Sequence, residues 1–258
     1  MKKKIGLALS GGGMRGIAHI GVLQALIEHG IYPSIVSGTS AGAIVGAMYA
    51  AGKTPSEMMD FVKQSSLLKI LKPSWPLNGL TTHAYLKEML IKYIEDDSFE
   101  ELDLPLYIVV TNLNSGKEEW IHTGELHDVI TASCAVPLIF KPVNLNGKLY
   151  VDGGLMNNLP ASPLVGKCDI LIGSNVMPVK DDLENSHFSS AIGVGTRIFE
   201  LAVWNNTMAS IFQLDVLIEP KNINEYNTFS LAHADSTFQK GYDETILQMD
   251  NILELYHS

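Results

Sequence analysis

Charged residues are scarce in this sequence, and the positive ones are the scarcer of the two signs. Asp, Glu, Lys and Arg make up 18% of the 258 residues, with 28 acidic against 18 basic residues and a formal net charge of −10. A nucleic-acid surface needs clustered Lys and Arg to displace counterions from phosphates. The composition therefore predicts no nucleic-acid partner. It also disfavours lasting electrostatic attachment to anionic lipid, although transient membrane contact stays open.

Cysteine is rare, and long apolar runs are missing. Cys134 and Cys168 are the two cysteines, too few for a disulfide framework, and we interpret them as reduced thiols. No uninterrupted apolar run reaches the ~18 residues that a transmembrane helix requires. The opening MKKKIGLAL superficially resembles a signal peptide, but its apolar stretch is short and runs straight into glycines. We therefore expect a cytoplasmic protein that is at most peripheral at a membrane.

What the sequence has instead is a high apolar content, 46% of residues, arranged in short runs and longer periodic segments. Ile5 to Leu9 is a short apolar run, and residues 14–29 follow with helical spacing up to Gly30. Ile35 to Ser37 is a second short run, and residues 41–51 form a small-residue helix. The order strand, helix, strand, helix predicts an α/β fold with a mostly parallel central sheet flanked by helices.

The same patterns continue along the chain without a repeat or a convincing linker. Residues 1–258 are therefore expected to form a single domain, with the motifs concentrated in residues 5–163. The predicted helices span residues 54–69, 82–94, 125–132, 192–212 and 236–256, and the predicted strands span residues 106–111, 118–122, 148–151, 169–174 and 214–219.

GTSAG at residues 38–42 matches the G-x-S-x-G nucleophile elbow. In that motif a serine, here Ser40, sits on a sharp turn between a strand and a helix with its hydroxyl exposed. Gly38 and Gly42 flank it because side chains there would collide with the neighbouring strand and helix. The N-terminus of the following helix would direct free N–H groups and partial positive charge at the serine and at an oxyanion formed there.

The glycine run Gly11-Gly12-Gly13-Met14-Arg15-Gly16 has two interpretations. Its spacing fits the G-x-G-x-x-G loop of a dinucleotide site, but that fold needs an acidic residue at the end of the second strand, where this chain has Ser37 to Ser40. The alternative is an oxyanion hole, in which bare backbone presents N–H groups to the negative oxygen of a tetrahedral intermediate. Arg15 either braces the loop or meets a phosphate-bearing substrate.

A serine nucleophile needs a group that accepts its proton. None of the eight histidines stands in a recognisable catalytic context; His187 and His233 are the candidates if the order follows that of an α/β-hydrolase. Asp152, at the end of a predicted strand and followed by Gly153 and Gly154, is the other candidate. Asp-Gly is a common turn signal, but a buried aspartate near Ser40 with a raised pKa would serve as the base directly, in a Ser-Asp dyad.

GGGMRG, GTSAG and DGG in this order resemble the patatin-like phospholipase family. Residues 131–137 with Phe140 and Pro142, and then Asn158 and Pro160, add to the resemblance, which covers residues 5–163. It implies a three-layer α/β fold and a lipid acyl hydrolase of the type found in bacteria, without metal or cofactor. Carried over by position, Ser40 is the nucleophile, Asp152 the base and the Gly11 to Gly16 loop the oxyanion hole, acting on a lipid or other acyl ester. Within this loop, Gly12 and Gly13 are the expected N–H donors.

Two further hypotheses are weighed against the hydrolase. A catalytically silent lipid- or partner-binding protein would have no need for the complete set of motifs, and a dinucleotide-binding oxidoreductase would lack a reactive serine. The segment at residues 67–77, LLKILKPSWPL, combines apolar residues, Trp75 and two lysines, a composition suited to a membrane interface. It is expected either to border an acyl-chain entrance or to cover the core.

Overall fold

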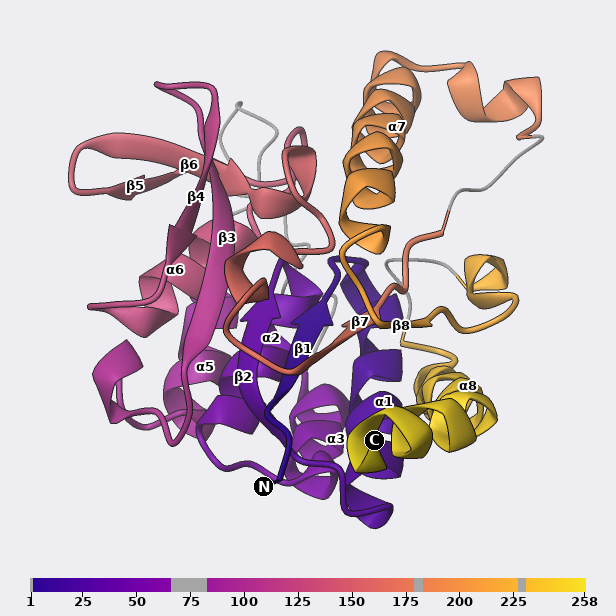
Figure 1. Ribbon diagram of the computed structural model, residues 1–258. Helices are drawn as coiled ribbons and strands as arrows, with labels where there is room; N and C mark the ends of the chain where they lie inside the picture. Colours follow the sequence, from indigo (N-terminus) through magenta and orange to yellow (C-terminus); the bar gives the residue numbers. More distant parts are fainter. Residues whose placement is uncertain (1, 66–82, 179–182, 227–230) are drawn as a thin grey trace.

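The structure is a computed structural model that describes residues 2–65, 83–178, 183–226 and 231–258 (Figure 1). Within these residues, eight strands form one sheet in the order β5-β6-β3-β2-β1-β7-β8, with β4 paired to β3 as well. The parallel strands are β1 (Ile5–Leu9), β2 (Pro33–Gly38), β3 (Leu106–Asn112), β7 (Ile170–Ser174) and β8 (Val216–Ile218); β4 (Lys117–Ile121) and β6 (Lys148–Asp152) pair antiparallel to β3, and β5 (Val143–Leu145) pairs antiparallel to β6.

The helices follow the predicted segments closely. The helix α3 begins as its sequence predicts, because Thr54 and Glu57 exchange the two hydrogen bonds of a capping box and Pro55 occupies the first turn. The α-helices are α1 (Ile17–Glu28), α2 (Ala41–Ala50), α3 (Pro55–Gln64), α5 (Ala84–Tyr93), α6 (Leu126–Ser133), α7 (Ala191–Ile211) and α8 (Ala234–His257). The 3-10 turns are η1 (Gly13–Gly16), η2 (Phe99–Glu101), η3 (Gly153–Leu155), η4 (Ser162–Leu164), η5 (Asn185–Phe188) and η6 (Ile223–Glu225).

Strand side chains alternate between two cores, as the period of a strand requires. Leu7 and Leu9 of β1 pack into the larger core with α1, α2, α3, α5, α6 and α8. Ala8 and Ile35 face the opposite side, where the chain around η4, the end of α7 and the start of β8 form a smaller core. The sheet is therefore the middle of three layers, and the predicted α/β fold is confirmed.

Two local predictions differ from the structure. The helix expected from Met14 starts as the 3-10 turn η1 and becomes α-helical only at Ile17, and the chain enters this turn through Gly13 with a φ of 56°, which favours glycine. The strand β5 (Val143–Leu145) was not predicted, since three residues are too short to display an alternating pattern. Neither difference moves the ends of β1, β2 and β6, which position the candidate site.

Candidate active site

The pairing of β3 brings Ser40 and Asp152 together. Gly38 at the end of β2 pairs with Ile108, and Asp152 at the end of β6 pairs with Val110. The strand β4 occupies the other edge of β3, so β2 and β6 share one edge, and because they run in opposite directions their carboxyl ends point toward each other. Ser40, which follows β2 by two residues, therefore lies close to Asp152, the last residue of β6.

Ser133, at the end of α6, closes the gap between these strand ends. Its hydroxyl donates to the carbonyl of Val109 at 2.7 Å and accepts the N–H of Ser40 at 2.8 Å. Ala135, shortly after it, accepts the N–H of Asp152 at 3.0 Å. The segment after α6 thus fixes the backbone of both candidate catalytic residues, and the N–H of Ser40 itself is not free to bind an oxyanion.

The turn at Ser40 has the geometry that the G-x-S-x-G pattern predicts. Ser40 lies between β2 and α2 with φ 53° and ψ −120°, a conformation that non-glycine residues rarely adopt. A Cβ atom on Gly42 would lie 2.3 Å from the carbonyl oxygen of Leu9, so α2 can approach β1 this closely only if residue 42 is glycine. The neighbouring backbone therefore holds Ser40 in a strained position at the N-terminus of a helix.

This strain gives a prediction about stability. Ser40→Gly is expected to be more stable than Ser40→Ala by about 1 kcal/mol, because glycine adopts positive φ without the Cβ clash. The same pair of substitutions at Ser34, an exposed residue of β2, should give the opposite order, since glycine weakens an ordinary strand. Urea unfolding of the four variants measures both differences. If alanine were the more stable substitution at both positions, the result would argue against strain at Ser40.

The glycine loop lies beside Ser40 and leaves two N–H groups unpaired. Gly11 donates its N–H to the carbonyl of Asn158 at 3.1 Å, and a Cβ atom on Gly11 would lie 3.2 Å from the Cβ of Ser40. The N–H groups of Gly12 and Gly13 have no acceptor among the described residues. Of the loop that the sequence singled out, these two positions present donors that are still available to a ligand.

Arg15 braces this loop from behind. Its Nε donates to the carbonyl of Tyr226 at 2.9 Å, and its Nη1 donates to Oδ1 of Asn224 at 3.2 Å. Burial lowers the pKa of its guanidinium. The arginine thus links η1 to the η6 region, in agreement with the bracing role, and Met14 and Gly16 line a neighbouring apolar pocket instead of the space next to Ser40.

Ser40, Asp152 and Gly11 to Gly13 all line one cavity with an empty volume of about 580 Å³, which α7 borders through Thr196, Phe199 and Glu200. In Figure 1, α7 stands beyond the carboxyl ends of β1 and β2. The described lining contains no histidine. His233 stacks on Tyr226 with ring centroids 4.9 Å apart, and His187 belongs to the turn η5, so the described cavity offers Asp152 as the base next to the serine.

Asp152 is 2% exposed, and this burial raises the pKa of its carboxyl to about 7. The nearby Ser40 hydroxyl and the N–H of Gly154, which donates to Oδ1 at 2.8 Å, offset part of the shift because both favour the ionised carboxylate. The other oxygen, Oδ2, is buried and has no well-formed hydrogen bond, and neither has Nδ2 of Asn158 in the same cavity. The cavity therefore contains an acceptor and a donor that are both unsatisfied.

Three supporting residues were not assigned a role from the sequence. Ser133 and Asn158 lie in segments that contribute to the family resemblance, so their place in those segments was a signal that they belong to the site. His19 gave no signal: it is fully buried in α1, where Nε2 donates to the carbonyl of Ser10 at 2.9 Å and Nδ1 accepts from Ser174 at 2.8 Å. Burial lowers its pKa to about 4, so it is neutral and supports the start of the glycine loop.

The remaining expectations concern the segment 67–77, membrane-spanning helices, metal ligands and the two cysteines. The segment 67–77 with Trp75 lies outside the described residues. In the part of the chain that is described, no helix is both long and apolar enough to cross a bilayer, and no cluster of three His, Cys, Asp or Glu side chains is placed to bind a metal ion. Both cysteines are free, Cys134 buried and Cys168 partly exposed.

Comparison with known proteins identifies the family of the chain. The model of the patatin-like phospholipase family matches residues 7–165, which include the glycine loop, Ser40 and Asp152. The chain belongs to this family. As a patatin-like protein it is 35% identical over 187 residues to an uncharacterised NTE family protein of Mycobacterium tuberculosis, covering 69% of this chain and 52% of the relative. It is also 31% identical over 196 residues to lysophospholipase NTE1 of Kluyveromyces lactis, covering 73% of this chain and 14% of the relative.

The chain thus spans about half the length of the mycobacterial relative and a much smaller part of the yeast protein. Among solved structures, VipD from Legionella pneumophila is similar with a TM-score of 0.67 and 17% identity, covering 97% of this chain and 67% of that one. This likeness concerns the fold, and it agrees with a patatin-like arrangement of the sheet and helices.

Proposed function

We propose that this patatin-like protein is a serine esterase that hydrolyses acyl esters of lipids through a dyad of Ser40 and Asp152. The observation that carries the proposal is a buried aspartate with a pKa of about 7 and an unpartnered oxygen, in the same cavity as a serine at a strained strand-to-helix turn. Strongly shifted carboxyl groups cluster at functional sites. A pKa close to neutrality suits a group that must accept a proton and later return it.

In the proposed reaction, Oδ2 of Asp152 accepts the proton of Ser40 as the serine oxygen attacks the carbonyl carbon of the ester. The negative oxygen that forms binds the N–H groups of Gly12 and Gly13, while the N-terminus of α2 adds favourable partial charge. Asp152 then protonates the departing alcohol, which leaves an acyl-Ser40 ester. Water hydrolyses this ester by the same steps, with Asp152 again taking and returning the proton.

The lipid class of the substrate rests on the relatives. The matched family is the patatin-like phospholipases, and the yeast relative is a lysophospholipase. Because the chain covers only a small part of that protein, the proposal takes over the chemical class, an acyl ester of a lipid, and not the partners or setting of the larger protein. Brief contact with a membrane would supply such a substrate, and neither a cofactor nor a metal takes part.

The proposal is tested by labelling and turnover on the parental protein. A fluorophosphonate should attach to the Ser40 peptide, as identified by mass spectrometry, and a panel of lysophosphatidylcholine, monoacylglycerol and p-nitrophenyl esters should release fatty acid or nitrophenol. Removing His233 should leave both results unchanged. A protein that binds lipid vesicles but neither labels nor hydrolyses any ester would instead be the silent binding protein on the same fold.

A further inference from the structure

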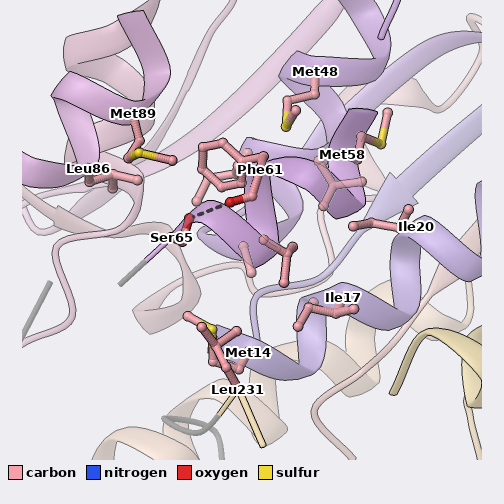
Figure 2. A pocket seen from close by; sticks show the side chains of 16 residues that line it. Met14, Ile17, Ile20, Met48, Met58, Phe61, Ser65, Leu86, Met89 and Leu231 are labelled. Carbon is pink, nitrogen blue, oxygen red and sulfur yellow. Dashed lines mark hydrogen bonds between the residues drawn. The ribbon is translucent and has the colours of Figure 1, made fainter. Parts of the chain in front are cut away.

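A second cavity lies on the other side of the glycine loop, between α1, α2, α3 and α5. The space has a volume of about 650 Å³, which includes space open to solvent, and among the described residues that line it Ser65 has the one polar side chain. The hydroxyl of Ser65 donates to the carbonyl of Phe61 at 2.7 Å, so it is already satisfied. Figure 2 shows the side chains of Met48, Met58 and Met89 around this space. The cavity, here called the methionine pocket, is therefore lined mainly by apolar side chains in the described part of the chain and suits an apolar guest.

Empty apolar space is unfavourable for a protein. The atoms around a void lose dispersion contacts, and stability falls as the unfilled volume grows. Water fills such a space poorly, since a water molecule needs two or more polar partners. A flexible hydrocarbon is the guest that restores these contacts, and unbranched methionine side chains can adapt to chains of different shape.

The methionine pocket and the catalytic cavity are neighbours that share one described lining residue. Gly13 lines both spaces, and Ala41, the residue directly after Ser40, lines the methionine pocket. A ligand held at the N–H groups of Gly12 and Gly13 is therefore at the boundary between the two. The pocket therefore lies next to the backbone that would bind the oxygen of an ester under attack.

The position of Asp152 decides which half of the ester enters which cavity. The base must return its proton to the leaving oxygen, so the alcohol departs on the side of Asp152, in the cavity that α7 borders. The carbonyl oxygen faces Gly12 and Gly13. The third substituent of the acyl carbon is the hydrocarbon chain. It then points toward Gly13 and Ala41, which line the methionine pocket.

We propose that the methionine pocket holds the acyl chain of the substrate and gives the enzyme a preference for long-chain esters. The inference rests on the proposed function and adds the orientation of the substrate and its chain-length dependence. Each methylene that becomes buried should raise kcat/KM about fourfold, the factor that corresponds to the transfer energy of one such group. The gain should end once the chain fills the pocket.

The test compares p-nitrophenyl decanoate with p-nitrophenyl butyrate. Val45, a residue of α2 that is 6% exposed, lines the pocket, and Val45→Phe fills part of it. The ratio of kcat/KM for decanoate over butyrate should fall at least tenfold in this variant. Val165→Phe makes the same change at a residue that is 56% exposed, and it should leave the ratio unchanged.

A binding measurement separates the pocket from catalysis. The fluorescent fatty acid cis-parinaric acid should bind the Ser40→Ala protein and be displaced by decanoate, and Val62→Phe, on α3, should weaken this binding in the same background. If the parental protein hydrolyses no ester but binds parinaric acid in this way, the proposed function fails and the pocket survives. If it hydrolyses both esters with equal efficiency, or the ratio in Val45→Phe equals that of Val165→Phe, the assignment of the pocket is wrong.

Discussion

Ser40→Ala is expected to lower kcat/KM for acyl esters by about 10⁴-fold or more, because the variant lacks the atom that forms the covalent intermediate. The methyl group fits where the hydroxyl was, and the residue lies 7% exposed in a cavity that is otherwise unchanged. Substrate binding should therefore survive, and the loss should appear in kcat and not in KM. Initial rates with p-nitrophenyl decanoate over a range of concentrations separate the two constants.

The matched control is Ser34→Ala on the same strand, β2. Ser34 is exposed, and its hydroxyl donates to the carbonyl of Ile5 at 3.4 Å, so this variant should hydrolyse the ester at the parental rate and keep its fluorophosphonate label. If Ser40→Ala retained parental activity while folded, as judged by circular dichroism, another residue would be the nucleophile.

The sequence predicted the elements around this site well, for a physical reason. Ile5 to Leu9 is a short apolar run between the lysines at 2–4 and the segment Ser10 to Gly13, which is typical of a buried strand. The capping residues before Pro55 determine the start of α3 within one residue. Such signals are local, and a chain segment carries them wherever it lies in the fold.

The relation between Ser40 and Asp152 could not be derived locally. It depends on β2 and β6 meeting end to end along β3, a pairing between residues far apart in the sequence. The strand-end position of Asp152 made it a candidate base for Ser40, alongside His187 and His233, and the resemblance to a known family favoured Asp152 among them. Ser133 could not be assigned a role locally either, because its hydroxyl bridges the N–H of Ser40 and the carbonyl of Val109, which are far from it in the sequence.

The glycine loop, Gly11 to Gly16, shows a further limit of prediction from the sequence. The glycine pattern predicted an oxyanion hole over Gly11 to Gly16, with Gly12 and Gly13 as the expected donors, but the pattern carries no information on hydrogen-bond partners that would separate these two from Gly11. The structure distinguishes them by their partners: Gly11 donates to Asn158, Arg15 binds the η6 region, and Gly12 and Gly13 keep free N–H groups. Hydrogen-bond partners depend on the tertiary fold, which a short motif does not encode.

Asp152→Asn is expected to lower kcat/KM by about 10²–10⁴-fold, because an amide cannot accept the proton of Ser40. In the parental enzyme the base works only when ionised, and its pKa is about 7. The parental kcat/KM should therefore fall about tenfold per unit as the pH drops below 7 and level off above it. The residual activity of Asp152→Asn should lack this inflection, and a parental profile that is flat from pH 5 to 8 would argue against Asp152 as the base.

The same substitution should make the folded protein more stable at pH 8. Burial raises the pKa of Asp152 from 3.8 to about 7, so between these values the folded chain holds a proton that the unfolded chain has released, and stability falls as the pH rises through that interval. Asparagine never ionises, and its amide oxygen can still accept the N–H of Gly154. The gain in unfolding free energy should be on the order of 2–4 kcal/mol above pH 7 and shrink toward zero near pH 4.

Urea unfolding of parental protein and Asp152→Asn at several pH values measures this gain. Asp250→Asn, which removes a carboxylate from the exposed face of α8, is the control, and its stability should differ little from the parental value at each pH. A gain that appears only for Asp152→Asn and grows from pH 4 to pH 7 would mean that the protein sacrifices stability to keep this carboxylate buried beside Ser40. A structural aspartate would behave in the opposite way: its removal would destabilise the protein, and most strongly at neutral pH, where a carboxylate bound to its partners contributes fully.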